Sequence, residues 1–143
     1  PFFLCVEETL AVLRDEGHQL AVATGKSRRG LDRVLEQHNM QSFFHATRCA
    51  DETKSKPHPQ TLHELLHHFE RKPVEALMVG DTHFDMAMAQ QAGMARVAVS
   101  YGAHHRDQLL PYEPLACLDH FSELLPVVAK VHGATVKPFI TPN

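Results

Sequence analysis

The chain has 143 residues, of which 43% are hydrophobic and 22% are charged, as in an ordinary globular domain. This composition excludes a wholly disordered, collagen-like or coiled-coil chain, and no apolar run reaches the length of a membrane span. The net charge of −3 combines 14 basic and 17 acidic residues, without the clustered basic excess typical of nucleic-acid-binding proteins. We therefore expect one domain whose partners include neither a nucleic acid nor a membrane.

Apolar and polar segments alternate along the chain as they do when strands are interleaved with helices. Short apolar runs predict strands at residues 20–24, 43–50, 76–79, 97–99 and 115–118. Helical periodicity and capping residues predict helices near residues 7–16, 27–35, 59–69, 84–91, 104–110 and 122–132, with Ser27 and Ser122 as N-caps. This order predicts an α/β fold, a Rossmann-like parallel sheet with helices on both faces.

The domain is expected to cover residues 1–132. The segment 133–143, which contains Pro138 and Pro142, is expected to be a loosely ordered tail.

Polar clusters follow several of the predicted strands, where ligands of parallel sheets bind. The first cluster is Thr24-Gly25-Lys26-Ser27, in which a strand-end hydroxyl, a glycine and a helix N-terminus form a small anion cradle. An ordinary strand-to-helix turn explains the same residues. A Walker A phosphate loop is excluded because Leu20 stands where that motif requires glycine.

The second cluster is Lys56-Pro57-His58-Pro59, a loop fixed by two prolines that leads into a helix. The Lys56 ammonium can act as a point charge for a phosphate group. A solvated lysine beside a helix start is the simpler alternative.

The third cluster lies between Gly80 and Gly93. Asp81 ends a predicted strand and Asp85 lies in the first turn of the next helix, so both carboxylates can face one point outside the sheet. Two carboxylate oxygens suit Mg²⁺, which keeps several waters and pairs with substrate phosphate. Turn formation and helix capping would explain one of these aspartates more easily than both.

In order and spacing, these clusters resemble motifs two, three and four of the haloacid dehalogenase-like (HAD) hydrolases. The specific segment reads Gly-Asp-Thr-x-x-Asp-x-x-x-Ala-x-x-Ala-Gly from Gly80, and the resemblance is closest to the phosphoglycolate phosphatase-like branch. It implies a Mg²⁺-dependent phosphatase that hydrolyses a small phosphomonoester, a phosphorylated metabolite such as phosphoglycolate, through an aspartyl-phosphate. It further implies that Thr24, Gly25 and Lys56 bind phosphate, that Thr24 and Lys56 are catalytic, and that Asp81 and Asp85 bind Mg²⁺.

The chain departs from the family pattern in one respect. HAD hydrolases carry their nucleophile in an Asp-x-Asp-Gly-Thr motif, and this sequence contains no Asp-x-Asp pair. We expect the first strand, the nucleophile and the substrate-selecting cap to precede Pro1, which leaves the sheet without its central strand and the chain alone inactive. The alternatives are a non-catalytic binding module and another HAD phosphoryl-transfer enzyme, such as a sugar phosphate mutase.

Histidine and cysteine provide two further observations. The segment His63-Glu64-Leu65-Leu66-His67 matches the HExxH zinc-protease pattern, but Pro73 stands where a third histidine ligand would follow, so we reject that function. The 12 histidines are otherwise without an assigned role. The three cysteines (Cys5, Cys49 and Cys117) are widely spaced and indicate reduced thiols of a cytoplasmic protein. A monomer or a homodimer is expected.

Overall fold

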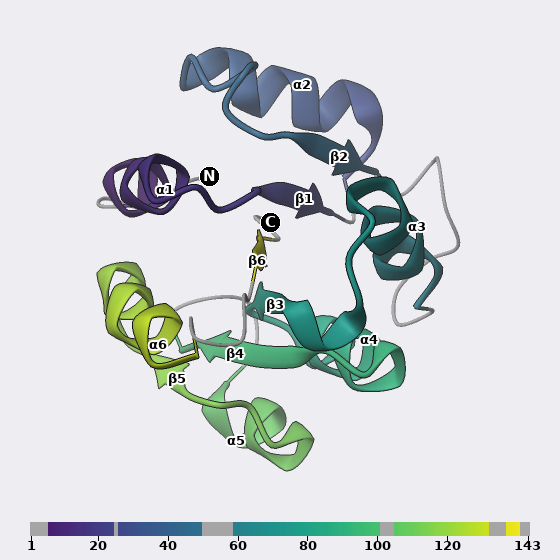
Figure 1. Ribbon diagram of the computed structural model, residues 1–143, viewed down its shortest axis with the longest axis vertical. Coiled ribbons are helices and arrows are strands. Elements are labelled where there is room, and N and C mark those ends of the chain that lie inside the picture. The colour runs from purple at the N-terminus through teal and green to yellow at the C-terminus, as the bar shows by residue number, and fades with distance from the viewer. Residues whose placement is uncertain (1–5, 25, 50–58, 101–104, 132–136, 141–143) are drawn as a thin grey trace.

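In the computed structural model, residues 6–24, 26–49, 59–100, 105–131 and 137–140 are described. Strands among them form one parallel sheet in the order β2-β1-β6-β3-β4-β5 (Figure 1). Their bounds are Ala21–Ala23 (β1), Ala46–Arg48 (β2), Ala76–Gly80 (β3), Ala95–Val99 (β4), Cys117–Leu118 (β5) and Lys137–Ile140 (β6).

Helices cover both faces of this sheet. Figure 1 shows α1 and α6 on one side, and α3 and α4 on the other. The α-helices are Val6–Asp15 (α1), Arg28–Gln37 (α2), Gln60–Phe69 (α3), His83–Ala92 (α4), Arg106–Leu109 (α5) and Leu124–Val131 (α6); the 3₁₀ turns are Pro73–Glu75 (η1), Leu110–Tyr112 (η2) and Phe121–Glu123 (η3). The prediction of an α/β fold with a helix-covered parallel sheet is confirmed.

The strand β3 shows why the sheet needs helices on both faces. Successive side chains of a strand point to opposite faces, and every residue of β3 is buried. Leu77 and Val79 join the core cluster beneath α1 and α2, whereas Met78 joins the cluster beneath α3 and α4. A strand buried on both faces reads as one continuous apolar run, which is how residues 76–79 stand in the sequence.

Local signals fix several of the helix ends. The Ser27 hydroxyl accepts a hydrogen bond from the Gly30 N–H at 3.1 Å, which confirms Ser27 as the N-cap of α2. Gly93 adopts a left-handed conformation with φ of 74° and ends α4. The prediction of Ser122 as an N-cap is wrong. Ser122 lies inside η3, whose N-cap is His120, because the Glu123 carboxylate accepts the His120 N–H at 2.9 Å.

The strand β6 occupies the middle of the sheet, between β1 and β3. The sequence predicts a sheet that lacks its central strand and a loose tail at 133–143, whereas residues 137–140 of that tail pair in parallel with both neighbours. Two buried strands left without a neighbour would carry unpaired backbone groups, and β6 supplies partners for both. Pro138, which has no N–H, is unusual in such a position and explains why the sequence alone does not indicate a strand there.

The edge strand β2 is covered by arginine side chains. Arg28 donates to the Thr47 hydroxyl at 2.7 Å and to the Thr47 carbonyl at 3.3 Å, and Arg48 donates to the same carbonyl at 3.0 Å. Charged side chains placed along an edge discourage a further strand from pairing there.

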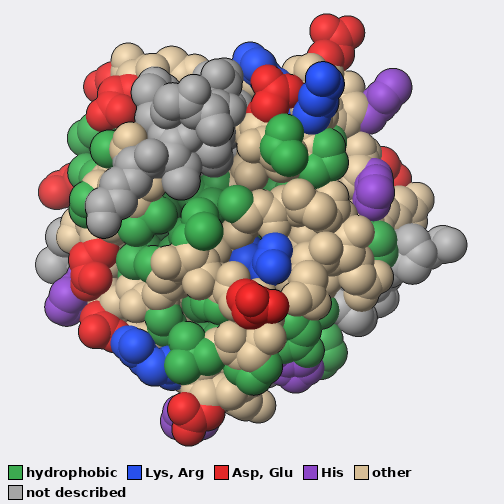
Figure 2. Space-filling model, turned by 60° about the horizontal axis from the view of Figure 1, so that its bottom comes forward, with side chains coloured by type: hydrophobic (Ala, Val, Ile, Leu, Met, Phe, Trp, Pro, Cys, Tyr) green, Lys and Arg blue, Asp and Glu red, His purple; other side chains and the backbone are tan. Residues whose placement is uncertain are grey.

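The charged side chains show no single-sign gathering on the side where α5 lies. In Figure 2, basic and acidic groups stand scattered among hydrophobic and neutral ones on that face. Among the described residues, the helices are too short or too polar to cross a lipid bilayer.

Candidate active site

The register of the sheet places two of the predicted site residues at the same level. Val22 and Val79 both pair with Ile140, so Thr24 and Asp81, two residues beyond each, lie level at the carboxyl edge. One strand separates β1 from β3, which sets their backbones about 10 Å apart. This carboxyl edge is the position at which parallel α/β sheets bind ligands.

Asp81 directly follows β3, and Asp85 lies in the first turn of α4. The Thr82 hydroxyl accepts the Asp85 N–H at 3.1 Å, and Asp85 Oδ2 accepts the Thr82 N–H at 3.3 Å, which together form a capping box. Both aspartates are buried, and Asp85 is completely so. The capping box therefore holds the Asp85 side chain over the start of α4, one short turn away from Asp81.

Gly80 is required by the close approach of Asp85. A Cβ atom added at Gly80 would lie 2.7 Å from Asp85 Oδ2 and 2.8 Å from its Cγ, well inside van der Waals contact. Only glycine leaves room for a carboxylate at this point of the backbone. The glycine that precedes Asp81 in the sequence motif is therefore needed because a side chain there would clash with Asp85.

The chemistry of this pair suits a hard divalent cation. Within the described ranges, no group of three or more His, Cys, Asp or Glu side chains is placed to hold one ion. An ion at Asp81 and Asp85 would accordingly take few protein ligands, and Mg²⁺ is the ion that is usually bound through one or two carboxylates, water and substrate phosphate. Two carboxylates fit Mg²⁺ better than they fit zinc, because structural zinc sites bind their ion through four protein ligands.

Thr24 is buried where β1 ends. Its hydroxyl accepts the Lys26 N–H at 3.1 Å, and its own N–H is bonded to the Arg48 carbonyl at 3.1 Å. The bond from the Lys26 N–H fixes the Thr24 hydroxyl at the start of the turn between β1 and α2. Gly25 and Lys56, the other two predicted site residues, lie outside the described residues.

A polar cluster that was not predicted lies at the same edge of the sheet. Ser100 follows β4 and Asp119 follows β5, and the Ser100 hydroxyl donates to Asp119 Oδ1 at 2.5 Å. Arg106 donates to the same oxygen at 3.1 Å. The signal was available, because Ser100 and Asp119 each stand directly after a predicted strand, as Thr24 and Asp81 do.

The Ser100–Asp119 hydrogen bond has a consequence for stability in acid. It lowers the pKa of the Asp119 carboxyl below its ordinary value, and the positive charge of Arg106 adds to this effect. A carboxyl whose pKa is lowered by folding stabilises the folded state above its unfolded pKa of about 3.9 and loses this contribution as the pH falls through the folded value. Ser100→Ala is therefore expected to be less stable than wild type at pH 7, with the difference shrinking in strong acid.

Urea denaturation of both proteins at pH 7, 5 and 3 measures that difference. Ser122→Ala, an exposed serine in η3, is the matched control and should follow wild type at every pH. A Ser100→Ala difference that stays constant or grows toward pH 3 would contradict the assignment.

Comparison with known proteins agrees with this geometry. Residues 2–99 match the family model described as "Haloacid dehalogenase-like hydrolase". The chain is 36% identical over 129 residues to the pyrophosphatase PpaX of Bacillus mycoides (strain KBAB4), covering 90% of this chain and 60% of the relative. It is 35% identical over 128 residues to PpaX of Bacillus cereus (strain B4264), with 89% and 59% covered.

Solved structures show the same fold. A crystal structure of a predicted phosphoglycolate phosphatase from Haemophilus somnus 129pt superposes with a TM-score of 0.84 and 28% identity, over 90% of this chain and 57% of that one. A HAD-superfamily hydrolase from Geobacter sulfurreducens PCA gives a TM-score of 0.73 and 29% identity, over 87% and 59%.

Three findings together define the class of this protein. They are two aspartates that follow β3, a strand-end threonine level with the first of them, and a match to the family model over two-thirds of the chain. The chain belongs to the haloacid dehalogenase-like hydrolases. It spans about 60% of the length of the curated relatives that it matches.

Proposed function

We propose that this chain carries the metal-binding and phosphate-binding part of a Mg²⁺-dependent phosphatase acting on a small phosphomonoester of the phosphoglycolate kind. The observation that carries the proposal is the pair of buried carboxylates, Asp81 and Asp85, at the carboxyl edge of the sheet and level with Thr24. Similarity to phosphatases of the same family supports it.

Each residue has a distinct part in the proposed reaction. Asp81 and Asp85 would hold Mg²⁺, which supplies positive charge beside the phosphoryl group when it is bound. Thr24 would donate its hydroxyl to a phosphate oxygen, and backbone N–H groups from Gly25 onward would add further donors. Lys56 would offset the negative charge of the phosphate and of the attacking carboxylate. In the intact enzyme the aspartate of the Asp-x-Asp motif, which this sequence lacks, would attack phosphorus and displace the alcohol or phosphate leaving group to form an aspartyl-phosphate. Water would then cleave that intermediate to inorganic phosphate and the free aspartate.

Pyrophosphate is the second candidate substrate, because the relatives that share 35–36% identity are named pyrophosphatases. Both substrates present a phosphoryl group to the same carboxylates, so the two differ only in the leaving group. We place the protein in the cytoplasm as a monomer or homodimer; the Cys117 thiol, which forms no disulfide, is compatible with a reducing compartment.

The test is Asp81→Asn in a chain that also carries the Asp-x-Asp motif. Loss of one carboxylate ligand is expected to lower Mg²⁺-dependent kcat/KM by about a hundredfold or more, for phosphoglycolate and pyrophosphate assayed side by side. Asp107→Asn, the same exchange at an exposed position of α5, should leave turnover unchanged. Retained turnover in Asp81→Asn would refute the proposal, and the 143-residue chain by itself should hydrolyse neither substrate.

A further inference from the structure

A second polar site lies beside the edge strand β2, on the outer side of α3. A pocket with a volume of about 420 Å³ is found between the edge strand β2 and this helix. Its lining comprises one residue of β2 and five of α3: Arg48, Gln60, His63, Glu64, His67 and His68. The lining contains three imidazoles, which the proposed phosphatase reaction does not use.

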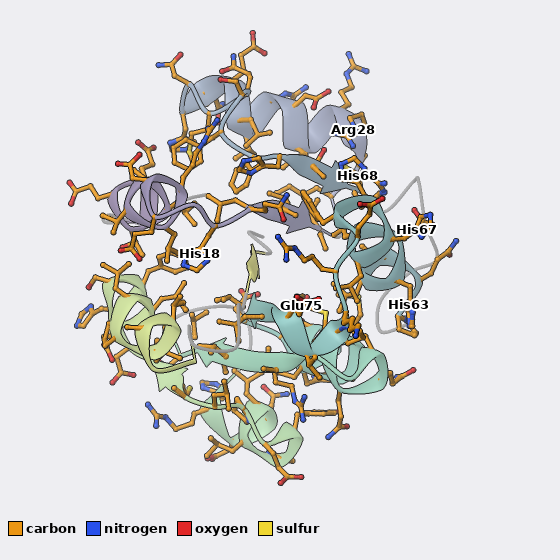
Figure 3. The ribbon with its side chains drawn as sticks, in the orientation of Figure 1. His18, Arg28, His63, His67, His68 and Glu75 are labelled. Atoms are coloured by element: carbon orange, nitrogen blue, oxygen red, sulfur yellow. The ribbon has the colours of Figure 1, made fainter. Side chains whose placement is uncertain are left out.

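The packing of α3 fixes which way these histidines face. Leu62, Leu65 and Leu66 are buried against the sheet, so the helix cannot turn about its axis without exposing them. His63 and His67 are exposed and stand one helical turn apart, a spacing that brings Cβ atoms within about 5–6 Å. Figure 3 shows both on the outer side of α3. Two imidazoles so placed can bind one ion from the same helix face.

Glu64 is held by another group in the same pocket. Its Oε1 accepts the Arg48 Nε–H at 3.2 Å, so the carboxylate and the guanidinium balance each other's charge. The glutamate of an HExxH protease must be available as a general base, and an arginine partner opposes that role. What the pocket offers an ion is therefore imidazole nitrogen, which suits copper, nickel and zinc and does not suit magnesium.

His68 does not belong to the same pair. Its ring packs edge-on against Phe69 with 4.9 Å between centroids, and Figure 3 shows it on the side of α3 nearer to Arg28. Consecutive helical residues point in directions about 100° apart, so His67 and His68 cannot easily share one ion. His67 and His68 both lie in the last turn of α3, where the helix dipole favours positive charge.

We infer that His63 and His67 form a two-point binding site for a divalent transition-metal ion such as Cu²⁺, Ni²⁺ or Zn²⁺, with water completing the coordination. Arg48, which lines the pocket, lies on a strand three inter-strand steps, roughly 14 Å, from the strand that precedes Asp81. The two sites also differ in ligand chemistry, nitrogen in one and carboxylate oxygen in the other. Cu²⁺ should bind more tightly than Ni²⁺ or Zn²⁺, following the usual order for nitrogen ligands.

Calorimetric titration of the metal-free full chain with Ni²⁺, Zn²⁺ and Cu²⁺ tests this inference, with excess Mg²⁺ present to occupy the carboxylate pair. We expect His63→Ala and His67→Ala each to weaken the binding of one ion per chain by about tenfold or more. His68→Ala is the control within the pocket and Asp81→Asn the control at the other site, and both should bind that ion as wild type does. All the exchanged histidines are exposed, so the melting temperatures should agree and confirm that the variants fold.

The other outcomes would overturn the inference. Unchanged binding in the His63→Ala/His67→Ala double variant would place the ion elsewhere among the histidines. Equal weakening by His68→Ala would replace the pair with a different ligand set. The titration measures metal binding and not turnover. A negative result would therefore refute the histidine site without bearing on the proposed phosphatase activity.

Discussion

Gly80→Ala is expected to lower Mg²⁺-dependent turnover by about a hundredfold, although the substitution adds only one methyl group. The new Cβ would lie within 3 Å of the Asp85 side chain, so the carboxylate must move and its hydrogen bond to the Thr82 N–H must break. A shift of about 1 Å in a catalytic ligand is enough for a loss of this size. Crowding in the core should also cost about 1–3 kcal/mol of unfolding free energy.

Turnover in a chain with the Asp-x-Asp motif and urea denaturation of the same protein measure the two effects. Gly30→Ala is the matched control, because among the described residues a Cβ at Gly30 meets Ser27 Oγ at 3.3 Å and Lys26 Cβ at 3.6 Å and nothing nearer. This variant should keep its activity and lose little or no stability, since alanine favours a helix over glycine. If Gly80→Ala retained both its activity and its stability, Asp85 would not need the position that we assign to it.

The largest loss of stability is expected for Leu77→Ala. Leu77 is fully buried in β3 and belongs to the larger core cluster. Its truncation removes buried apolar surface and leaves a cavity in a strand with neighbours on both sides and helices on both faces, which costs about 2–5 kcal/mol.

Leu115→Ala makes the same chemical change at a side chain that is 53% exposed. It should alter the free energy of unfolding by less than about 0.5 kcal/mol. Chemical denaturation of the three proteins at one pH gives the comparison. Similar losses in both variants would mean that β3 does not lie at the centre of the core.

The sequence predicts most of this fold because its signals are local. The apolar run at 76–79, the cap at Ser27 and the glycine at 93 each specify a strand or a helix end through neighbouring residues, and the structure confirms them. The structure places Asp81 directly after β3 and Asp85 in the first turn of α4, as the sequence indicates, and their role as a metal-binding pair stays a prediction.

The features that sequence reasoning missed depend on distant contacts. Nothing near residues 137–140 indicates a strand, and only the positions of β1 and β3 explain why a segment with a proline pairs there. The pocket beside α3 likewise needs Arg48, which comes from a strand in another part of the sequence and takes up the Glu64 carboxylate.

The position of β6 makes the completion of the sheet a long-range step in folding. In the described part of the chain, strand pairing joins β1 with β2 and β3 with β4 and β5, and only β6 links these two groups into one sheet. Each group is built from contacts between segments close in sequence, whereas β6 must close long loops to reach β1 and β3. If the two groups of strands form first, they become one sheet only when β6 pairs with both. Refolding should then show a late phase whose rate follows the pairing of β6.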